Sequence, residues 1–310
     1  MCGMRTMHLF LSRRDRRGER LQTFNGGVRE MTRISDNPYV PRKAVLLSRK
    51  ELSPTCTLYR FRGEGRGPFS FTPGQFLLLT VPGVGEAPFS ISSAPSEDGT
   101  FEFCIKRVGR VTDHLHRSAR EGDVFGIRGP YGRGFPVEEM KGKDVLFIAG
   151  GIGYAPLRSV LLHLLKERES VGQISFLYGV NTPVELIFRD EVREQAEAGT
   201  VHYWISLMEG DLDDFPAPWS RGLVTDFIPR VPADPENAIA LLVGPPVMYR
   251  TAVEKLFEKG FREENIFLSL ERRMECGIGK CGHCAIGYRY TCVHGPVFPY
   301  FEAITLTEAI

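Results

Sequence analysis

Four cysteines near the C-terminus are the residues of this chain with the clearest chemical potential. Cys276, Cys281 and Cys284 follow the spacing C-x4-C-x2-C, and Cys292 comes shortly after them. This is the spacing of a plant-type [2Fe–2S] loop, in which thiolates hold the iron. Glycines between the cysteines let the backbone bend tightly and turn its N–H groups toward the sulfurs. The pattern predicts an iron–sulfur centre, held by all four cysteines, that moves single electrons.

Other interpretations of these cysteines stay open. Four cysteines can also hold zinc, although zinc sites usually present two C-x2-C pairs and only one occurs here. His283 and His294 follow Cys281 and Cys292 at C-x-H spacing, which is faintly Rieske-like. With four cysteines present, we expect both histidines to be exposed loop residues. A disulfide is disfavoured, because the remaining cysteines occur singly and nothing signals secretion.

Length and composition indicate a globular protein of two or three domains. The chain has 310 residues, of which 42% are hydrophobic and 25% charged, and its net charge is +1. This near-neutral balance argues against nucleic acid as the main partner. No apolar run approaches the roughly 18 residues that a membrane helix needs. We therefore expect a cytoplasmic protein without a membrane partner.

Residues 1–33 form an arginine-rich extension that we leave out of the fold prediction. Its only apolar stretch, Leu9–Leu11, is too short for a secretory signal. We expect a disordered tail, or a misassigned start with translation beginning at Met31. An organelle transit peptide is the open alternative.

The stretch 34–138 has the pattern of a small all-β domain. Short apolar runs are separated by turn sequences such as Pro73-Gly74 and Asp98-Gly99. Six such runs in about a hundred residues predict a closed antiparallel barrel. The expected strands are Val45–Leu47, Thr57–Phe61, Phe76–Val81, Phe89–Ile91, Phe101–Ile105 and Val124–Ile127.

A short helix should interrupt these strands. Thr112 and Asp113 are its candidate N-caps. Gly109 precedes them, and a helix N-terminus that follows a glycine is a good position for a pyrophosphate.

The stretch 139–265 alternates strands with helices, which predicts a parallel-sheet α/β domain. The buried strand Val145–Ala149 runs into glycines 150, 151 and 153, and a helix begins at Pro156. Backbone N–H groups at such a turn can approach a dinucleotide pyrophosphate. Further strands are expected at Ile174–Tyr178, Val201–Leu207, Ala238–Val243 and Ile266–Leu270, with a helix at Val247–Lys259. Residues 266–310 should form a small C-terminal [2Fe–2S] lobe.

From about Pro38 to Phe301 the chain resembles the ferredoxin–NADP reductase superfamily. The flavin motif of that superfamily, Arg-x-Tyr/Phe-Ser/Thr, falls on 87–90, and its pyrophosphate motif, Gly-x-x-Ser/Thr, falls on 109–112. Ala87 replaces the usual arginine, so one cationic contact to the FAD phosphates is lost, which Arg107 or Arg110 could replace. The resemblance implies an FAD site that comprises Pro88, Phe89, Ser90, Ile105, Lys106, Arg107, Gly109, Val111 and Thr112.

The resemblance also implies a site for NAD(P)H. The family motifs Gly-Gly-x-Gly, Tyr-Gly and Cys-Gly-Pro-x-x-Met have counterparts here, with Val243 in place of the cysteine. The implied contacts are Gly150, Gly151, Gly153, Tyr178, Gly244, Pro245 and Met248. The choice between NAD and NADP stays open, because residues 178–183 include no ribose-binding acid. Arg189 could bind a 2′-phosphate or lie on a solvated helix face.

Within the superfamily, the cysteine loop and the Gly-Pro-Val-Phe run at 295–298 most resemble the gamma electron-transfer subunits of cytoplasmic NAD(P)-linked nickel–iron hydrogenases (sulfhydrogenases). The electron-transfer subunits of dihydroorotate dehydrogenase and of anaerobic sulfite reductase are also similar. The resemblance implies a diaphorase-like subunit with FAD between NAD(P)H and a [2Fe–2S] cluster, no protein acid or base in the hydride step, and iron–sulfur and hydrogenase subunits as partners. A non-catalytic zinc-binding regulatory module is the alternative from another class.

Overall fold

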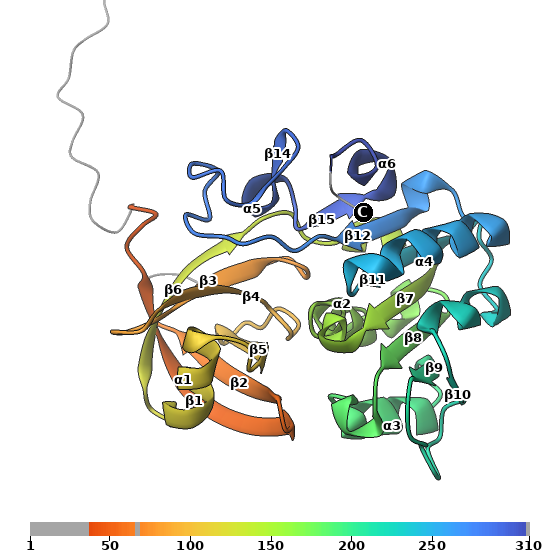
Figure 1. Ribbon diagram of the computed structural model, residues 1–310, viewed down its shortest axis with the longest axis horizontal. Helices are drawn as coiled ribbons and strands as arrows, with labels where there is room; N and C mark the ends of the chain where they lie inside the picture. Colours follow the sequence, from red (N-terminus) through yellow and green to blue (C-terminus); the bar gives the residue numbers. More distant parts are fainter. Residues whose placement is uncertain (1–36, 66–68, 308–310) are drawn as a thin grey trace, which may run out of the picture. The chain divides into compact units, whose positions relative to one another are not determined.

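The computed structural model describes residues 37–65 and 69–307. Two large β-sheets and a small hairpin organise this part of the chain (Figure 1). The predicted N-terminal extension lies outside the described residues.

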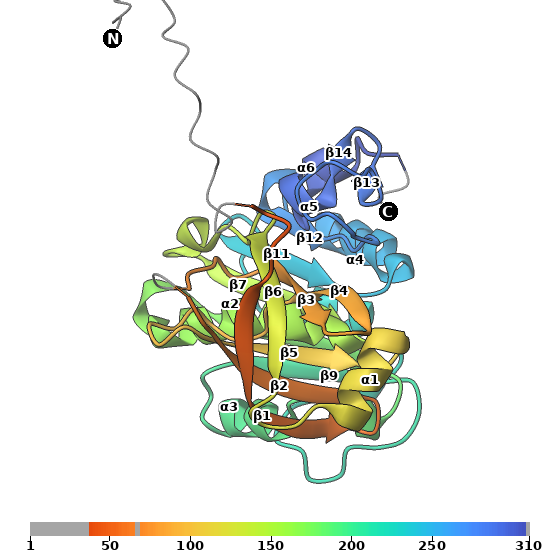
Figure 2. The ribbon, with the colours of Figure 1, turned by 90° about the vertical axis from the view of Figure 1, so that its left-hand side faces the viewer.

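The first sheet is the predicted antiparallel barrel (Figure 2). Its six strands run in the order β4-β3-β6-β1-β2-β5, so neighbours in space are mostly not neighbours in sequence. All six predicted strands are present, although β4 begins earlier than expected and ends before Ile91. The strands are β1 (Arg42–Ser53), β2 (Cys56–Gly63), β3 (Phe76–Val81), β4 (Gly85–Ser90), β5 (Thr100–Lys106) and β6 (Val124–Tyr131).

An aromatic core fills the barrel and brings its two edge strands together. Phe61, Phe101 and Phe103 are buried and pack against one another, with ring centroids 5.2–5.7 Å apart. At the seam, Phe89 of β4 meets Phe103 of β5 at 5.7 Å. Just beyond β4, the Ser92 N–H donates to the Glu102 carbonyl over 2.8 Å. These contacts place β4 where its residues can face the second sheet.

The short helix α1 (Arg110–Ser118) has its N-cap three residues before the first of its two predicted caps. Gly109 is the N-cap, so the assignment of Thr112 or Asp113 to that position was wrong. The Thr112 hydroxyl instead reaches back and accepts from the N–H groups of Val108 and Gly109, each over 2.9 Å. Asp113 pairs with Arg107 and Arg117. Thr112, the third residue of the helix, therefore plays the N3 part of a capping box, in which its side chain satisfies the backbone N–H of the N-cap.

The second sheet has seven strands in the order β10-β9-β8-β7-β11-β12-β15, and all are parallel except β15. Its strands are β7 (Asp144–Gly150), β8 (Ile174–Val180), β9 (His202–Leu207), β10 (Trp219–Arg221), β11 (Ala238–Val243), β12 (Ile266–Ser269) and β15 (Val297–Pro299). Helices α2 (Tyr154–Lys166) and α3 (Arg189–Glu197) cover one face, and α4 (Pro246–Lys259) covers the other. Short 3-10 turns occupy Val137–Met140, Gly151–Gly153, Arg168–Ser170, Pro183–Glu185, Val224–Arg230 and Glu263–Asn265.

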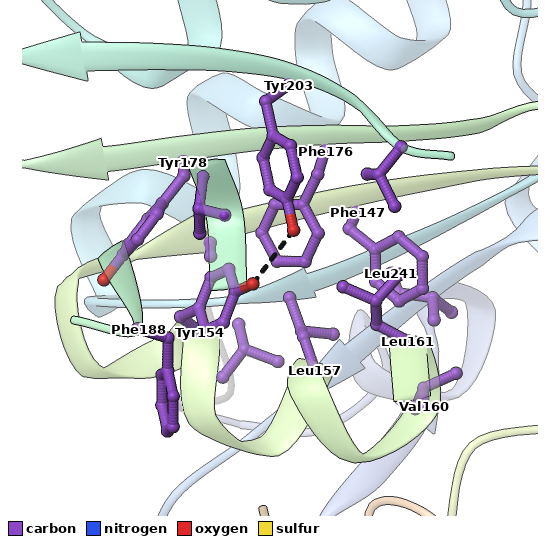
Figure 3. Packing of buried hydrophobic residues seen from close by; sticks show 14 of the residues in the cluster. Phe147, Tyr154, Leu157, Val160, Leu161, Phe176, Tyr178, Phe188, Tyr203 and Leu241 are labelled. Atoms are coloured by element: carbon purple, nitrogen blue, oxygen red, sulfur yellow. Dashed lines mark hydrogen bonds between the residues drawn. The ribbon is translucent and has the colours of Figure 1, made fainter. Parts of the chain in front are cut away.

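A cluster of aromatic rings joins α2 to the central strands (Figure 3). Tyr154 packs between Phe176 and Tyr178, with both ring centroids 4.7 Å away. Its hydroxyl bonds to the hydroxyl of Tyr203 over 2.9 Å. Burial of this many large rings fixes the start of α2 against the sheet, directly after the predicted glycine turn.

The C-terminal stretch contributes to the second sheet as well as to the cysteine loop. Both β12 and β15 come from beyond residue 265, whereas the hairpin β13 (Ala285–Ile286) and β14 (Arg289–Tyr290) and the helices α5 (Thr291–His294) and α6 (Tyr300–Ala303) surround or follow the cysteines. The division of the chain at residues 138 and 265 stays a prediction. Over the described ranges, no helix has the length and apolar character needed to cross a bilayer.

Arg158 of α2 ties the two sheets together from a buried position. Its guanidinium donates to Glu191 of α3 over 2.7 Å and to Glu102 of β5 over 2.9 Å. It also donates to the carbonyl oxygen of Ser92 over 3.0 Å. The guanidinium of Arg158 therefore donates hydrogen bonds both to the barrel and to a helix that covers the second sheet.

Replacing Arg158 by methionine should lower the free energy of unfolding by about 3–5 kcal/mol, because two largely buried carboxylates would lose their cation. Arg250→Met is the matched control, since Arg250 forms an exposed pair with Glu254 at 4.0 Å and should cost at most about 1 kcal/mol. Urea denaturation of both variants measures the difference. Equal stability of the two variants would contradict this role.

Candidate functional site

Three of the four predicted cluster cysteines lie on the loop before β13, and the fourth, Cys292, lies in the short helix α5. Cys276, Cys284 and Cys292 are buried, whereas Cys281 is exposed. Cys284 and Cys292 pack in a small apolar cluster with Phe76 and Leu78 of β3. The loop therefore has an apolar inner side against the barrel and one cysteine at the surface.

Backbone N–H groups of the loop point at the sulfurs, as the glycine spacing predicts. The Cys276 sulfur accepts from the N–H groups of Lys280 at 3.3 Å and Cys281 at 3.4 Å. The Cys292 sulfur accepts from Gly279 at 3.2 Å. Such donors stabilise negative charge on sulfur and are typical of iron–sulfur loops.

The loop closes against the barrel at Gly277. The φ of this residue is +76°, and a Cβ there would lie 2.6 Å from the ring of Tyr131. Only glycine accommodates both the conformation and the close approach. A larger residue would push the cysteines away from β6.

Arg128 of β6 binds the backbone of the cysteine loop. The buried guanidinium donates to the backbone carbonyls of Cys276 at 2.9 Å and Glu275 at 3.0 Å. It also pairs with Glu86 of β4. Burial alone would raise the pKa of Glu86, but hydrogen bonds from Arg128 and Thr80 lower it below its usual value. Glu86 is therefore a carboxylate, and the pair anchors the loop electrostatically.

The four sulfurs suit a metal centre whose iron atoms carry positive charge. Burial, with the neighbouring Cys284 thiol, raises the pKa of Cys292 to about 12. A thiolate at this position requires positive charge beside it, which iron supplies. His283 is exposed and pairs with Glu275 at 3.2 Å, and ligand atoms of these two residues and the Cys281 sulfur lie within 4.8 Å of one another. The His294 ring accepts from the Tyr290 N–H. His294 is half-buried in α5, so its predicted exposure was wrong.

A cavity of about 220 Å³ lies between the barrel and the second sheet. Five of the residues predicted for FAD line it, namely Pro88, Phe89, Ser90, Lys106 and Thr112. Phe76 and Met274 line another part of the wall. Both of these residues also pack in the apolar cluster around Cys284 and Cys292. The small cavity therefore shares residues with the packing of the cysteine loop.

The other four residues predicted for FAD do not line this cavity. Ile105 is buried in the barrel core, and Val111 packs against that core. Arg107 is held by Asp113, with Nε 2.7 Å from the carboxylate oxygen. Gly109 caps α1 next to the lining residue Thr112.

A second cavity of about 750 Å³ opens at the carboxyl ends of the parallel strands. This is where open α/β sheets bind their ligands. Six of the seven residues predicted for NAD(P)H line it, namely Gly150, Gly151, Gly153, Gly244, Pro245 and Met248. The exception is Tyr178, whose side chain is fully buried in the aromatic cluster of Figure 3, whereas the next residue, Gly179, lines the cavity.

The glycine turn brings the backbone of α2 close to β11. A Cβ at Gly153 would collide with the carbonyl oxygen of Val243, so this position excludes every other residue. Farther along the wall, the buried hydroxyl of Thr225 has no hydrogen-bond partner among the described residues. An unpaired buried hydroxyl beside a cavity is available to a polar ligand.

The two cavities share one wall. Lys106, Ile152, Leu270, Glu271 and Arg272 line both of them. Burial raises the pKa of the Glu271 carboxyl. Sequence reasoning missed Glu271, Arg272 and Arg128, because no motif marks them. It named Arg189, which is exposed beside Phe215 and does not line the large cavity.

Comparison with known families assigns all three regions. Residues 43–135 match the oxidoreductase FAD-binding domain, and residues 147–254 match the oxidoreductase NAD-binding domain. Residues 271–304 match the iron–sulfur cluster binding domain of dihydroorotate dehydrogenase B. The predicted FAD, nicotinamide dinucleotide and iron–sulfur centre are thereby confirmed as cofactor classes, and the zinc alternative is disfavoured.

Relatives are similar over most of the chain. The sulfhydrogenase 1 subunit gamma of Pyrococcus furiosus is 42% identical over 89% of this chain and 97% of its own length. A probable dihydroorotate dehydrogenase B (NAD(+)) electron transfer subunit of Methanocaldococcus jannaschii is 35% identical over 74% of this chain and 80% of its own. The structure of an NADH-dependent reduced ferredoxin-NADP oxidoreductase is 25% identical over 84% of this chain and 91% of that one, with a TM-score of 0.67. The chain therefore belongs to the ferredoxin–NADP reductase-like flavoproteins, in the family that includes the sulfhydrogenase gamma subunits.

Proposed function

We propose that this chain is an electron-transfer subunit that links NAD(P)H, FAD and a [2Fe–2S] cluster to a partner redox subunit. The observation that carries this proposal is that the large cavity shares lining residues with the small cavity, and the small cavity shares residues with the packing of the cysteines. Residues such as Lys106 and Glu271 line both cavities. Phe76 lines the small cavity and packs with Cys284 and Cys292. Three sites in contact, with the flavin site in the middle, suit a transfer chain.

The central position of the flavin follows from the chemistry of the bound groups. A nicotinamide exchanges two electrons as a hydride, the cluster exchanges one electron, and FAD can do both. The protein supplies orientation and excludes water. In the small cavity Phe89 and Ser90 of β4 are the residues we assign to the flavin ring, and Thr112 at the start of α1 to the pyrophosphate.

We assign to Arg110 the cationic contact to the FAD phosphates that is lost because Ala87 replaces the usual arginine. Arg107 is already engaged by Asp113, at 2.7 Å. Arg110 extends toward the start of β4, and its guanidinium lies 3.5 Å from a Cβ built at Gly85. Arg110 therefore reaches β4 two residues before Ala87, and it is free of the Asp113 pair.

We assign the cluster cysteines to [2Fe–2S], with Cys281 at the surface through which electrons reach the partner. The partner we propose is a cytoplasmic nickel–iron hydrogenase, because the similarity to the gamma subunit extends over nearly the whole chain. Dihydroorotate dehydrogenase is the second candidate, favoured by the family match of the cluster loop. Purification of the native complex and identification of its other subunits tests this. A hydrogenase large subunit supports the first partner, and an orotate-reducing subunit overturns it.

Substitution of Gly151 tests the dinucleotide site. Its φ is +55° and a Cβ there has no neighbour within 4 Å, so Asn and Asp both fit. Gly151→Asp should raise the KM for NAD(P)H about tenfold above that of Gly151→Asn, because a carboxylate repels the pyrophosphate. Steady-state dye reduction measures both constants. Equal KM values would place the pyrophosphate elsewhere.

Substitution of Cys281 tests the order of the sites. Cys281→Ser should lower the iron content and abolish reduction of the partner, while NAD(P)H-dependent dye reduction persists in part, because the flavin cavity is untouched. Cys56→Ala, a buried cysteine outside the loop, is the control and should keep its iron. Metal analysis and both assays on the native complex give the result. Loss of both activities with FAD still bound would overturn the proposed order.

A further inference from the structure

The Glu275 side chain lies beside the exposed sulfur of the cysteine loop. A carboxylate oxygen of Glu275, a ring nitrogen of His283 and the Cys281 sulfur all lie within 4.8 Å of one another, and the three residues are exposed. A separate metal ion bound by these three residues would take Cys281 away from the four-sulfur set, to which its spacing and the family match assign it. The Glu275 carboxylate is therefore a charged neighbour of that set.

Two contacts fix Glu275 at this position. Arg128 donates to its backbone carbonyl over 3.0 Å, and Nε2 of His283 lies 3.2 Å from its Oε1. Glu275 directly precedes Cys276, and His283 directly precedes Cys284, so the pair joins the two ends of the loop. The side chain of Glu275 is 48% exposed. The carboxylate is thus held near the sulfurs without being buried.

The nearby cations of this region have other partners. The Lys280 ammonium lies over the ring of Tyr39, 5.8 Å from its centre. The Arg128 guanidinium pairs with Glu86 of β4. Both cations are therefore engaged away from the Glu275 carboxylate, which leaves the negative charge of that group close to the exposed cysteine.

A negative charge beside an iron–sulfur centre opposes the uptake of an electron. Reduction adds one negative charge to a centre that already has four thiolate ligands, so a neighbouring carboxylate disfavours the reduced form more than the oxidised form. We propose that the Glu275 carboxylate lowers the reduction potential of the cluster and that His283 holds it in position. This inference rests on the proposed function, in which the cluster receives single electrons from FAD. A lower potential makes the reduced cluster a stronger reductant toward the partner subunit.

A redox titration of the full chain, loaded with FAD and iron and followed by the EPR signal of the reduced cluster, measures this potential. It is run at about pH 8.5, so that proton uptake by imidazole groups does not contribute. Glu275→Gln removes only the charge. At a fixed potential this variant should have a ratio of reduced to oxidised cluster about fivefold higher, a shift of about 40 mV, because tenfold corresponds to about 59 mV for one electron.

Two further variants separate charge from shape. Glu275→Lys reverses the charge and should raise the same ratio about 25-fold, whereas Glu275→Asp keeps the charge and should stay within about twofold of the wild type. Glu197→Gln is the matched control. Glu197 is an exposed glutamate that pairs with Arg193 at 3.6 Å on α3, away from the cysteine loop (Figure 1), and its loss should leave the potential unchanged.

The inference is overturned if Glu275→Gln and Glu275→Lys keep the wild-type potential, or if Glu197→Gln shifts it as far as Glu275→Gln does. The proposed function fails separately, and the inference with it, if the wild-type chain gives no iron–sulfur signal at all. A wild-type signal whose potential does not respond to the charge at position 275 overturns the inference alone.

Discussion

The buried guanidinium of Arg128 is the contact on which the arrangement of the sites depends. It joins Glu86 of β4 to the backbone of the cysteine loop at Glu275 and Cys276. A charge in such a position is tolerated only when its partners stay in place, because an unpaired buried ion is costly. Strand β4 also carries Phe89 and Ser90, which line the small cavity. Strand β4 therefore fixes the position of the cysteine loop relative to the flavin cavity, because it binds the loop through Glu86 and Arg128 and also lines the cavity.

A second buried arginine with carboxylate partners joins the two sheets. Arg158 bonds to Glu102 of the barrel and to Glu191 of α3, so the start of α2 cannot move far from β5. The glycine turn before α2 forms the floor of the large cavity, and the aromatic cluster under it leaves little freedom. Electron transfer needs cofactors at constant separation. In this chain, buried ion pairs and ring packing provide that constancy.

Local patterns in the sequence predict most of the elements and the cysteine loop, but not the contacts between distant segments. The apolar runs and turns gave the barrel strands, and the C-x4-C-x2-C spacing marked the loop, because both depend on neighbours in sequence. The Arg128–Glu86 pair spans 42 residues and has no local signal. Tyr178 belongs to a family motif, yet alternation along β8 turns its ring into the core and leaves Gly179 at the cavity. Three-residue strands such as β10 and β15 are too short for a periodic pattern.

The central claim is that the flavin stands between the nicotinamide and the iron–sulfur centre. Rapid mixing of the anaerobic, FAD-loaded and iron-loaded protein with NAD(P)H, followed at flavin and iron–sulfur wavelengths, tests it most directly. The account predicts that flavin absorbance falls first and the iron–sulfur band follows, and that protein stripped of FAD shows no reduction of the iron–sulfur band. Reduction of the iron–sulfur centre by NAD(P)H in the FAD-free protein would contradict it.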